Sequence, residues 1–529
     1  MPARPRAVFL TLFALLAWQL WSQTRQDEAW SPRLILEILD AATGQPTAAR
    51  FTVTAKGQEH EPRWVGTHGL RYVSVHVSKK QTYIVTAARG TGPVEVPLPP
   101  GAERVRIDIA KGFDYFPLSL QAKVEGDPVR LTARLKRWNR LHEDGWRAAD
   151  AHLHYDRPSP EADRDWFHLM AADGLDFAQF MLLKGGMVPG VWARQYAYGR
   201  HGEHSNRRQT IIPGMEYRDR LQGHVLLFGS SEVIPPIMAG TPEAPHNWPT
   251  FFDVLERARR GGALVGPAHG GTLSRSPTAV ADALLGAVDF WEIGNAHLWE
   301  LEDWYKLMNI GVILPPMAGT DLPNNPYRDP WQPFLGSMRT YTRTGVATGS
   351  DVWNDIVRRG EVFVTSGPLI ELSVNGEGPG GTVRLPSGGG EVTVKARLES
   401  PRSLDNLEII RNDEAPEVAE GSKKGAEVNQ IVIERKLQFQ KSGWIAARGR
   451  GGPIEAISQH EVAHTAAVRV LVGDEPIRSE QTVSELLSRL HHQKQFYASN
   501  GSYPDPAARA KMLEIFDRAA ERLQSAQAP

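Results

Sequence analysis

Cysteine is absent from all 529 residues. The chain therefore has no disulfide, no thiol nucleophile, no cysteine-ligated zinc and no cysteine-linked lipid anchor. Any bound metal must be held by histidine, aspartate, glutamate and water, and this donor set suits Zn²⁺, Mn²⁺ or Fe²⁺.

An excess of charge of either sign is also missing. Lysine and arginine number 60 against 61 aspartates and glutamates, for a net charge of −1. This balance gives no support for a nucleic-acid partner or for a strongly electrostatic membrane surface. A small-molecule substrate is the expected partner, and the sequence does not indicate an oligomeric state.

Long hydrophobic runs are scarce, and the main one lies at the N-terminus. Arg4 and Arg6 precede an apolar run from Ala7 to Leu20. A basic start followed by a short apolar run is typical of a secretory signal, and this run is short for a membrane span. We predict a signal peptide over 1–23 and a periplasmic or secreted protein. An uncleaved N-terminal anchor is the alternative, because no clear A-x-A cleavage site follows.

The hydrophobic patterning divides the rest of the chain into four regions, and a chain of this length exceeds one ordinary core. Residues 30–137 show short alternating runs, such as Val105-Arg-Ile-Asp-Ile109, separated by turns containing glycine and proline. This pattern predicts a small β-sandwich. The region resembles the carboxypeptidase-regulatory-like sandwiches found beside secreted catalytic domains.

In residues 140–370 the pattern changes to strands alternating with helices, with helices expected at Glu161–Ala172, Thr250–Arg260 and Trp299–Met308. Such alternation implies parallel strands with crossover helices, which we interpret as a distorted barrel. Residues 371–476 return to a β pattern and predict a second β-sandwich domain. Residues 479–526 have helical periodicity and predict a hairpin of two helices.

The most informative motif is Asp150-Ala-His152-Leu-His154. Two histidines at i and i+2 of a strand point to the same face, so they can hold one metal ion. Asp150 could be a ligand or an acceptor that orients a histidine N–H, and the second role is favoured.

Further metal-binding side chains follow near the ends of later strands. They are Glu216, His224, His269 and Asp321. Ligands at successive strand ends are how a parallel α/β barrel builds an active site. Glu216 could bridge two metals, and Asp321 could bind metal and accept the proton of an attacking water.

Together these motifs resemble the PHP (polymerase and histidinol phosphatase) superfamily, and within it the carbaryl-hydrolase-like (CehA/McbA-type) metallohydrolases. The resemblance covers roughly 140–475 and also includes Gly174-Leu-Asp-Phe177, Trp291-Glu-Ile-Gly-Asn295 and Val364-Thr-Ser-Gly-Pro368. It implies a PHP-type barrel flanked by the two β-sandwich domains. It also implies metal ligands at His152, His154, Glu216, His224, His269 and Asp321, and hydrolysis of an ester, carbamate or phosphoester bond.

Two departures from the family pattern bear on the number of metals. Leu183 and Pro323 stand where the family has histidines. We therefore expect one or two metals rather than three: a well-occupied site at His152, His154, Glu216 and Asp321, and a weaker one near His224 and His269. Lys184, beside a lost ligand, is a candidate donor to a substrate oxyanion, and a solvated lysine is the alternative.

Two other functions are left open by the sequence. The loss of two histidines and the flanking β domains would also fit a non-catalytic binding protein on a degenerate barrel. His460-Glu461-Val-Ala-His464 formally matches the zinc protease signature H-E-x-x-H. That signature requires a helix, whereas the flank Thr465–Val472 is β-like.

Overall fold

The structure is a computed structural model, and it describes residues 32–56, 58–59, 68–76, 81–186, 188–271, 278–295, 298–299, 301–323, 334–420, 427–454 and 459–525. The predicted signal peptide, 1–23, lies outside the described residues. Internal contacts divide the chain into two compact units. The first comprises Met1–Tyr72, Thr86–Lys111 and Pro117–Lys136, and the second comprises Val73–Val85, Gly112–Phe116 and Arg137–Pro529.

The N-terminal region is built entirely of strands among its described residues. A three-stranded sheet has the order β6-β1-β9, and a larger sheet has the order β4-β5-β2-β7-β8 with β3 on β2. Alternate residues of β7 are buried, as the alternating pattern predicts. The bounds are β1 Arg33–Asp40, β2 Ala49–Ala55, β3 Gln58–Glu59, β4 Gly69–His76, β5 Gln81–Ala88, β6 Val94–Pro97, β7 Arg104–Ala110, β8 Leu118–Lys123 and β9 Val129–Leu135.

Seven strands of the second unit form a ring. In order around the ring they are β10 (Arg147–Leu153), β11 (Phe177–Lys184), β14 (Thr210–Asp219), β15 (Gly223–Phe228), β17 (Leu264–Pro267), β18 (Trp291–Asn295) and β20 (Pro316–Gly319). Ladders join β10 through β17 and join β18 to β20, with register shifts in the β10–β11 and β18–β20 pairs. Single backbone hydrogen bonds connect the remaining neighbours. Between β17 and the start of β18, Asp289 N donates to Val265 O; between the end of β20 and β10, Asp321 N donates to His152 O.

The strand directions differ from those expected. β10, β11 and β14 are parallel, and β18 is parallel to β20, but β15 is antiparallel to both β14 and β17. A short turn after Asp219 returns the chain directly and leaves no room for a crossover helix. As a consequence His224, at the start of β15, lies opposite Arg218, near the end of β14.

The helices of this unit agree with the sequence pattern to within a few residues. The expected helix at Thr250–Arg260 is α3 (Phe251–Arg260), and Thr250 Oγ1 caps it by accepting from Asp253 N at 3.1 Å. The other helices are α2 (Asp163–Ala172), α4 (Ala279–Leu284), α5 (Glu302–Asn309) and α6 (Ser350–Arg359), with short turns η2 (Gly199–His201) and η3 (His269–Gly271). Short strands β12 (Val191–Trp192), β13 (His204–Ser205), β16 (Met238–Ala239) and β19 (Leu298–Trp299) complete the region.

The β-rich region after the ring continues one of its sheets. From β10 the sheet runs through β21, β22, β30, β29, β26 and β27, while β23, β25 and β28 form a separate three-stranded sheet. The bounds are β21 Arg339–Thr342, β22 Val362–Thr365, β23 Leu369–Val374, β24 Thr382–Leu385, β25 Gly390–Ser400, β26 Leu404–Arg411, β27 Glu417–Glu420, β28 Asn429–Phe439, β29 Gly443–Ile454, β30 Gln459–Thr465 and β31 Val468–Val472.

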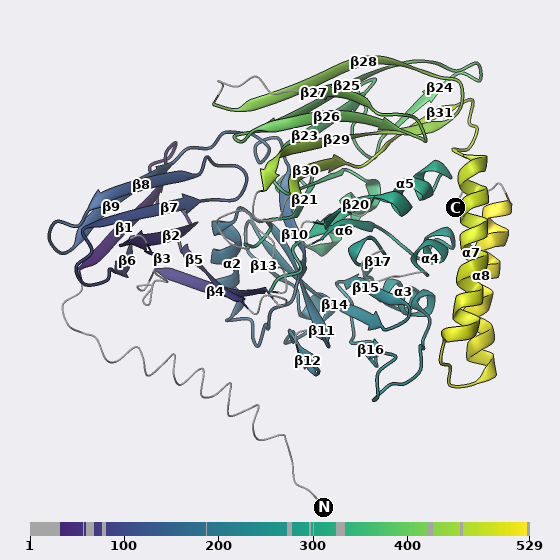
Figure 1. Cartoon of the computed structure of the whole chain (residues 1–529), viewed down its shortest axis with the longest axis horizontal. Coiled ribbons are helices and arrows are strands. Elements are labelled where there is room, and N and C mark those ends of the chain that lie inside the picture. The colour runs from purple at the N-terminus through teal and green to yellow at the C-terminus, as the bar shows by residue number, and fades with distance from the viewer. Residues whose placement is uncertain are drawn as a thin grey trace, which may run out of the picture. The chain divides into compact units, whose positions relative to one another are not determined.

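The chain closes with two long antiparallel helices, α7 (Glu480–Asn500) and α8 (Pro506–Gln524), drawn in yellow in Figure 1. Met512, Ile515 and Phe516 of α8 are buried in the same hydrophobic cluster as α3 and α4 residues. No helix among the described residues has the length and apolarity needed to span a membrane.

Candidate metal centre

His152 and His154, at the end of β10, each have one ring nitrogen held by an acceptor. His152 Nδ1 lies 2.8 Å from Glu292 Oε1, and His154 Nδ1 lies 3.0 Å from the carbonyl oxygen of Met181. A carbonyl oxygen and a carboxylate only accept, so we assign the proton of each ring to Nδ1. Both rings are almost fully buried.

The second nitrogens of the two rings face each other. His152 Nε2 and His154 Nε2 are 3.1 Å apart. With the protons on Nδ1, both Nε2 atoms carry lone pairs, and two buried lone pairs at this distance repel unless a cation lies between them. The pair thus has the chemistry of two neighbouring metal ligands.

Two carboxylates complete this group. Glu216 Oε2 lies 3.2 Å from His154 Nε2 and 3.9 Å from His152 Nε2, while Asp321 Oδ1 lies 3.3 and 3.5 Å from the same atoms. Four donors held tetrahedrally at about 2.1 Å from one ion are about 3.4 Å from each other. The separations of the two histidine nitrogens from each other and from each carboxylate therefore match the edges of one coordination sphere.

A second group adjoins the first and shares the Glu216 carboxylate. One ligand atom each of Glu216, His224 and His269 lies within 4.8 Å of the others. His224 Nδ1 is 2.7 Å from Glu216 Oε1 without hydrogen-bond geometry, and His269 Nε2 is 3.7 Å from Asp321 Oδ2. Glu216 Oε1, His224 Nδ1 and His269 Nε2 are buried and have no hydrogen-bond partner among the described residues. The structure thus places in one cluster all six residues that the family resemblance implies as ligands.

The electrostatics of the cluster favour positive charge. Burial alone would lower the pKa of His152, but Glu292 and Asp321 outweigh it and raise the pKa well above its ordinary value. Burial would raise the pKa of Glu216, but His224, Arg218 and hydrogen bonds from His152 and His154 hold it well below its ordinary range. Burial lowers the pKa of His224 to about 4, so its imidazole is neutral near pH 7. The ionised carboxylates therefore attract positive charge into the cluster, and a divalent ion that displaces the added ring proton of His152 can supply that charge.

Asp150 fixes the backbone around the cluster. Its Oδ1 accepts from His152 N at 3.1 Å and Thr320 N at 3.0 Å, and its Oδ2 accepts from Thr320 Oγ1 at 2.7 Å and Gly336 N at 2.8 Å. The expected role of orienting a histidine ring is wrong, because Asp150 accepts the backbone N–H of His152 rather than a ring N–H. It instead anchors the segment that carries Asp321 to β10.

Glu292 is a site residue that the sequence reasoning did not assign. Its Oε1 holds His152 Nδ1, and its Oε2 accepts from His269 N at 2.6 Å, so one buried carboxylate positions two candidate ligands. The signal was visible as a lone acidic residue between the apolar residues Trp291 and Ile293. A carboxylate behind a metal-binding histidine fixes the ring and raises its basicity.

The backbone is strained at two candidate ligands. His269 has φ 54° and Asp321 has φ 57°, a left-handed conformation that non-glycine residues rarely adopt. Strain of this kind is retained where the surrounding structure holds a functional side chain in place. Gly319 allows the close approach of β20 to β10, because a Cβ there would lie 2.5 Å from His152 N.

Lys184 ends β11, and its side chain is partly exposed. Among the described residues it forms no hydrogen bond or ion pair with the six candidate ligands. A backbone hydrogen bond and the Thr241 side chain lower the pKa of Glu243 most, and attraction to Lys184 adds to this effect, so Lys184 and Glu243 lie near each other. Its role as an oxyanion donor therefore stays a prediction.

The H-E-x-x-H motif does not form a metal site. It lies on strand β30, where residues four apart are about 13 Å from each other. His464 Nε2 is 2.7 Å from Tyr305 Oη, and His460 Nδ1 is 2.7 Å from Asp405 Oδ2. The β-like flank indicated this outcome correctly.

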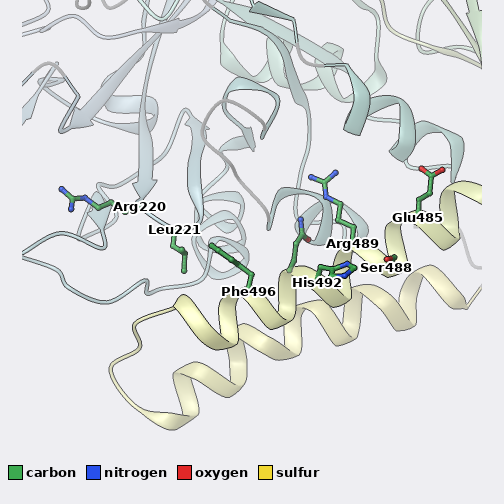
Figure 2. A pocket seen from close by; sticks show the side chains of 8 residues that line it. Arg220, Leu221, Glu485, Ser488, Arg489, His492 and Phe496 are labelled. Atoms are coloured by element: carbon green, nitrogen blue, oxygen red, sulfur yellow. The ribbon is translucent and has the colours of Figure 1, made fainter.

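A groove lies between α7 and the turn after β14 (Figure 2). It has a cavity volume of about 700 Å³. Its lining residues are Arg220, Leu221, Glu485, Ser488, Arg489, His492, Gln493 and Phe496. It shares no residue with the candidate metal centre.

No protein-family model and no curated protein matches the chain. Among solved structures, the lesion-specific endonuclease PfuEndoQ from Pyrococcus furiosus is 15% identical over 40% of this chain and 56% of that chain, with a TM-score of 0.26. Endonuclease Q in complex with a 27-mer duplex substrate carrying an abasic lesion is 16% identical over 41% of this chain and 56% of that chain, with a TM-score of 0.25. The chain thus spans just over half the length of the endonucleases that it matches.

These two similarities, at 15% and 16% identity, are too weak to carry any inference about the superfamily of this chain. At TM-scores of 0.26 and 0.25 they support no inference about the reaction of this chain. Its function must be inferred from the site itself.

Proposed function

We propose that the chain is a metal-dependent hydrolase of the PHP type, in the carbaryl-hydrolase-like branch that its motifs resemble. The observation that supports this most strongly is the 3.1 Å separation of His152 Nε2 and His154 Nε2, with both Nδ1 atoms already held by acceptors. Glu216 and Asp321 complete a set of four donors around them.

A divalent ion bound by these four side chains would supply a Lewis acid that polarises the scissile bond and makes water a better nucleophile near neutral pH. The protein contributes orientation and proton transfer. Glu292 fixes the His152 ring, and Met181 O fixes the His154 ring. These contacts hold both Nε2 atoms toward the reacting centre before substrate arrives.

Asp321 is the proposed proton acceptor. Its side chain is 21% exposed, against 3% for Glu216 and none for Glu292, so it is the carboxylate that water and substrate can reach. Asp321 Oδ1 faces His152 and His154, and Asp321 Oδ2 faces His269. The Asp321 carboxylate therefore points into the cluster from the side that solvent can reach. A carboxylate so placed can take the proton of an attacking water.

The substrate class follows from the family resemblance: an ester, a carbamate or a phosphoester. Export to the periplasm or outside the cell follows from the apolar run after Arg4 and Arg6. The substrate class and the export of the chain each require a direct test. Expression with a C-terminal tag, fractionation, and N-terminal sequencing of the mature chain would test the export.

Chelation tests the hydrolase proposal. The purified protein is assayed on 4-nitrophenyl acetate, a 4-nitrophenyl carbamate and bis(4-nitrophenyl) phosphate, before and after prolonged dialysis against EDTA. We expect activity on at least one substrate, its loss on chelation, and its return with Mn²⁺ or Zn²⁺. Asp321→Asn should retain less than about 1% of the activity, because general base catalysis contributes about 100- to 10,000-fold. Activity that survives chelation would exclude the proposed mechanism.

Non-catalytic binding on the same scaffold is the second candidate, favoured by Leu183 and Pro323 at the two positions where the family has histidines. Metal content separates the two functions. A protein that carries no metal after metal-replete expression, and hydrolyses none of the three substrates, would favour binding alone.

A further inference from the structure

We propose that Arg218 serves as a built-in cation in place of a second metal ion, so that the native protein holds one ion and its second metal position is latent. The inference rests on the metal centre of the proposed function and concerns the neighbouring group formed by Glu216, His224 and His269. Three buried atoms of that group lack hydrogen-bond partners among the described residues, so it can accept a cation.

The hydrogen bonding of His224 is the first reason. Arg218 Nε donates to His224 Nε2 at 2.8 Å. Nε2 must therefore carry a lone pair, and the single proton of the neutral ring must be on Nδ1. Nδ1 faces Glu216 Oε1 across 2.7 Å, where a carboxylate attracts a proton and repels a lone pair. In this tautomer neither ring nitrogen is free to bind a metal.

Metal binding through His224 Nδ1 would reverse this arrangement. The ring proton would move to Nε2 and would point at the Nε–H of Arg218. Two donors would then face each other at 2.8 Å. A second ion can enter only if the Arg218 guanidinium moves away.

The position of the charge is the second reason. Arg218 Nε lies 3.8 Å from Glu216 Oε1, the oxygen that the first metal group does not use. The guanidinium therefore already neutralises the part of the carboxylate that a second ion would bind. Its side chain is only 17% exposed, so solvent screens this interaction weakly.

The backbone holds Arg218 in this position. Within β14, Arg218 is two residues after Glu216, so both side chains lie on the same face of the strand. It pairs with His224 of β15 on one side and with Met238 of β16 on the other, and Arg218 N donates to Ile237 O at 2.9 Å. Because the Arg218 backbone is paired with a strand on each side, backbone motion alone cannot carry its side chain out of the cluster.

Metal counting tests the inference without relying on activity. The full chain, the Arg218→Met variant and the Arg220→Ala variant are saturated with Mn²⁺ or Zn²⁺, freed of excess ion and analysed by inductively coupled plasma mass spectrometry. Arg218→Met keeps the length of the side chain and removes the charge and the donor. Arg220 is an exposed arginine two residues further on, in the separate groove of Figure 2, and is the matched control.

We expect one ion per chain in the wild type and in Arg220→Ala, and two in Arg218→Met. Adding His224→Ala to Arg218→Met should return the count to one. Arg218→Ala, checked by circular dichroism, gives the same comparison if the methionine variant does not fold. Two ions in the wild type, or one ion in both Arg218 variants, would overturn the inference while leaving the metal centre intact. No ion in the wild type would refute the metal centre itself and this inference with it.

Discussion

Replacing Glu292 with glutamine should weaken metal binding at a centre that Glu292 does not ligate. Its two oxygens accept from His152 Nδ1 at 2.8 Å and from His269 N at 2.6 Å. A glutamine side chain has one accepting oxygen and one donating NH₂ group. In one of the two contacts, the NH₂ group would therefore face another N–H donor. Because the site is fully buried, water cannot take over the lost contact.

The expected size of the effect follows from the role of such carboxylates. Removing the group that orients a metal-binding histidine reduces metal affinity by about 10- to 100-fold, or about 1.4 to 2.7 kcal/mol. Loss of a hydrogen bond to a charged group also costs about 1.5 to 3 kcal/mol of folding stability. Glu292→Gln should therefore both bind Zn²⁺ more weakly and unfold at a lower temperature.

Competition with a chromogenic chelator measures the affinity, and thermal unfolding of the metal-free protein measures the stability. Asp289→Asn is the matched control, because Asp289 Oδ2 accepts from a backbone donor, Val265 N at 3.0 Å, but contacts no candidate ligand. The control should lose stability and keep its metal affinity. An unchanged affinity in Glu292→Gln, or an equal loss in both variants, would refute the orienting role.

Three further predictions concern stability and site assembly. Asp282 is fully buried in α4 with no hydrogen-bond partner for either oxygen among the described residues, and burial raises its pKa to about 8. The folded state therefore keeps a proton on Asp282 that the unfolded state releases near pH 4. Stability should fall as the pH rises from about 4 to 8. Asp282→Asn, which removes this titration, should raise the melting temperature at pH 9. His464→Ala should lower stability by about 1 to 3 kcal/mol by removing the acceptor of the Tyr305 hydroxyl proton, with metal content unchanged. Gly319→Ala should destabilise the fold by about 1 to 3 kcal/mol and lower metal content, because the added Cβ would lie 2.5 Å from His152 N.

Each of these predictions has a clear contrary result. A melting temperature that rises from pH 6 to pH 9, or a lower value for Asp282→Asn at pH 9, would contradict the buried neutral acid. Loss of metal in His464→Ala would contradict the finding that the H-E-x-x-H motif does not form a metal site. Full metal content in Gly319→Ala would mean that β20 can move without disturbing His152.

The candidate ligands could be predicted because their signals are local. The spacing of His152 and His154 places both rings on one face of a strand, and each of the other four ligands lies near a strand end. The antiparallel direction of β15 could not be predicted in the same way, because a run such as Val225–Phe228 has the same hydrophobicity in either direction. That direction is what brings His224 to the site.

Arg218 and Glu292 show two kinds of missed signal. Arg218 follows Glu216 by two residues, so strand periodicity alone predicts that it faces the cluster, and it was overlooked because arginine is not a metal ligand. Glu292 was visible as a charge in an apolar strand, but its two partners, His152 and His269, are distant in sequence. The left-handed φ of His269 and Asp321 has no signal in the sequence, since both depend on neighbouring strands.

The most direct test of the metal centre is a crystal structure of the protein grown with Mn²⁺ or Zn²⁺, with anomalous scattering recorded at the metal edge. The proposed function predicts one strong anomalous peak within about 2.3 Å of His152 Nε2, His154 Nε2 and a carboxylate oxygen of Glu216 or Asp321. No peak between the two histidine nitrogens, or a strong peak at another site with this one empty, would contradict the proposal that His152 and His154 bind the metal on which hydrolysis depends.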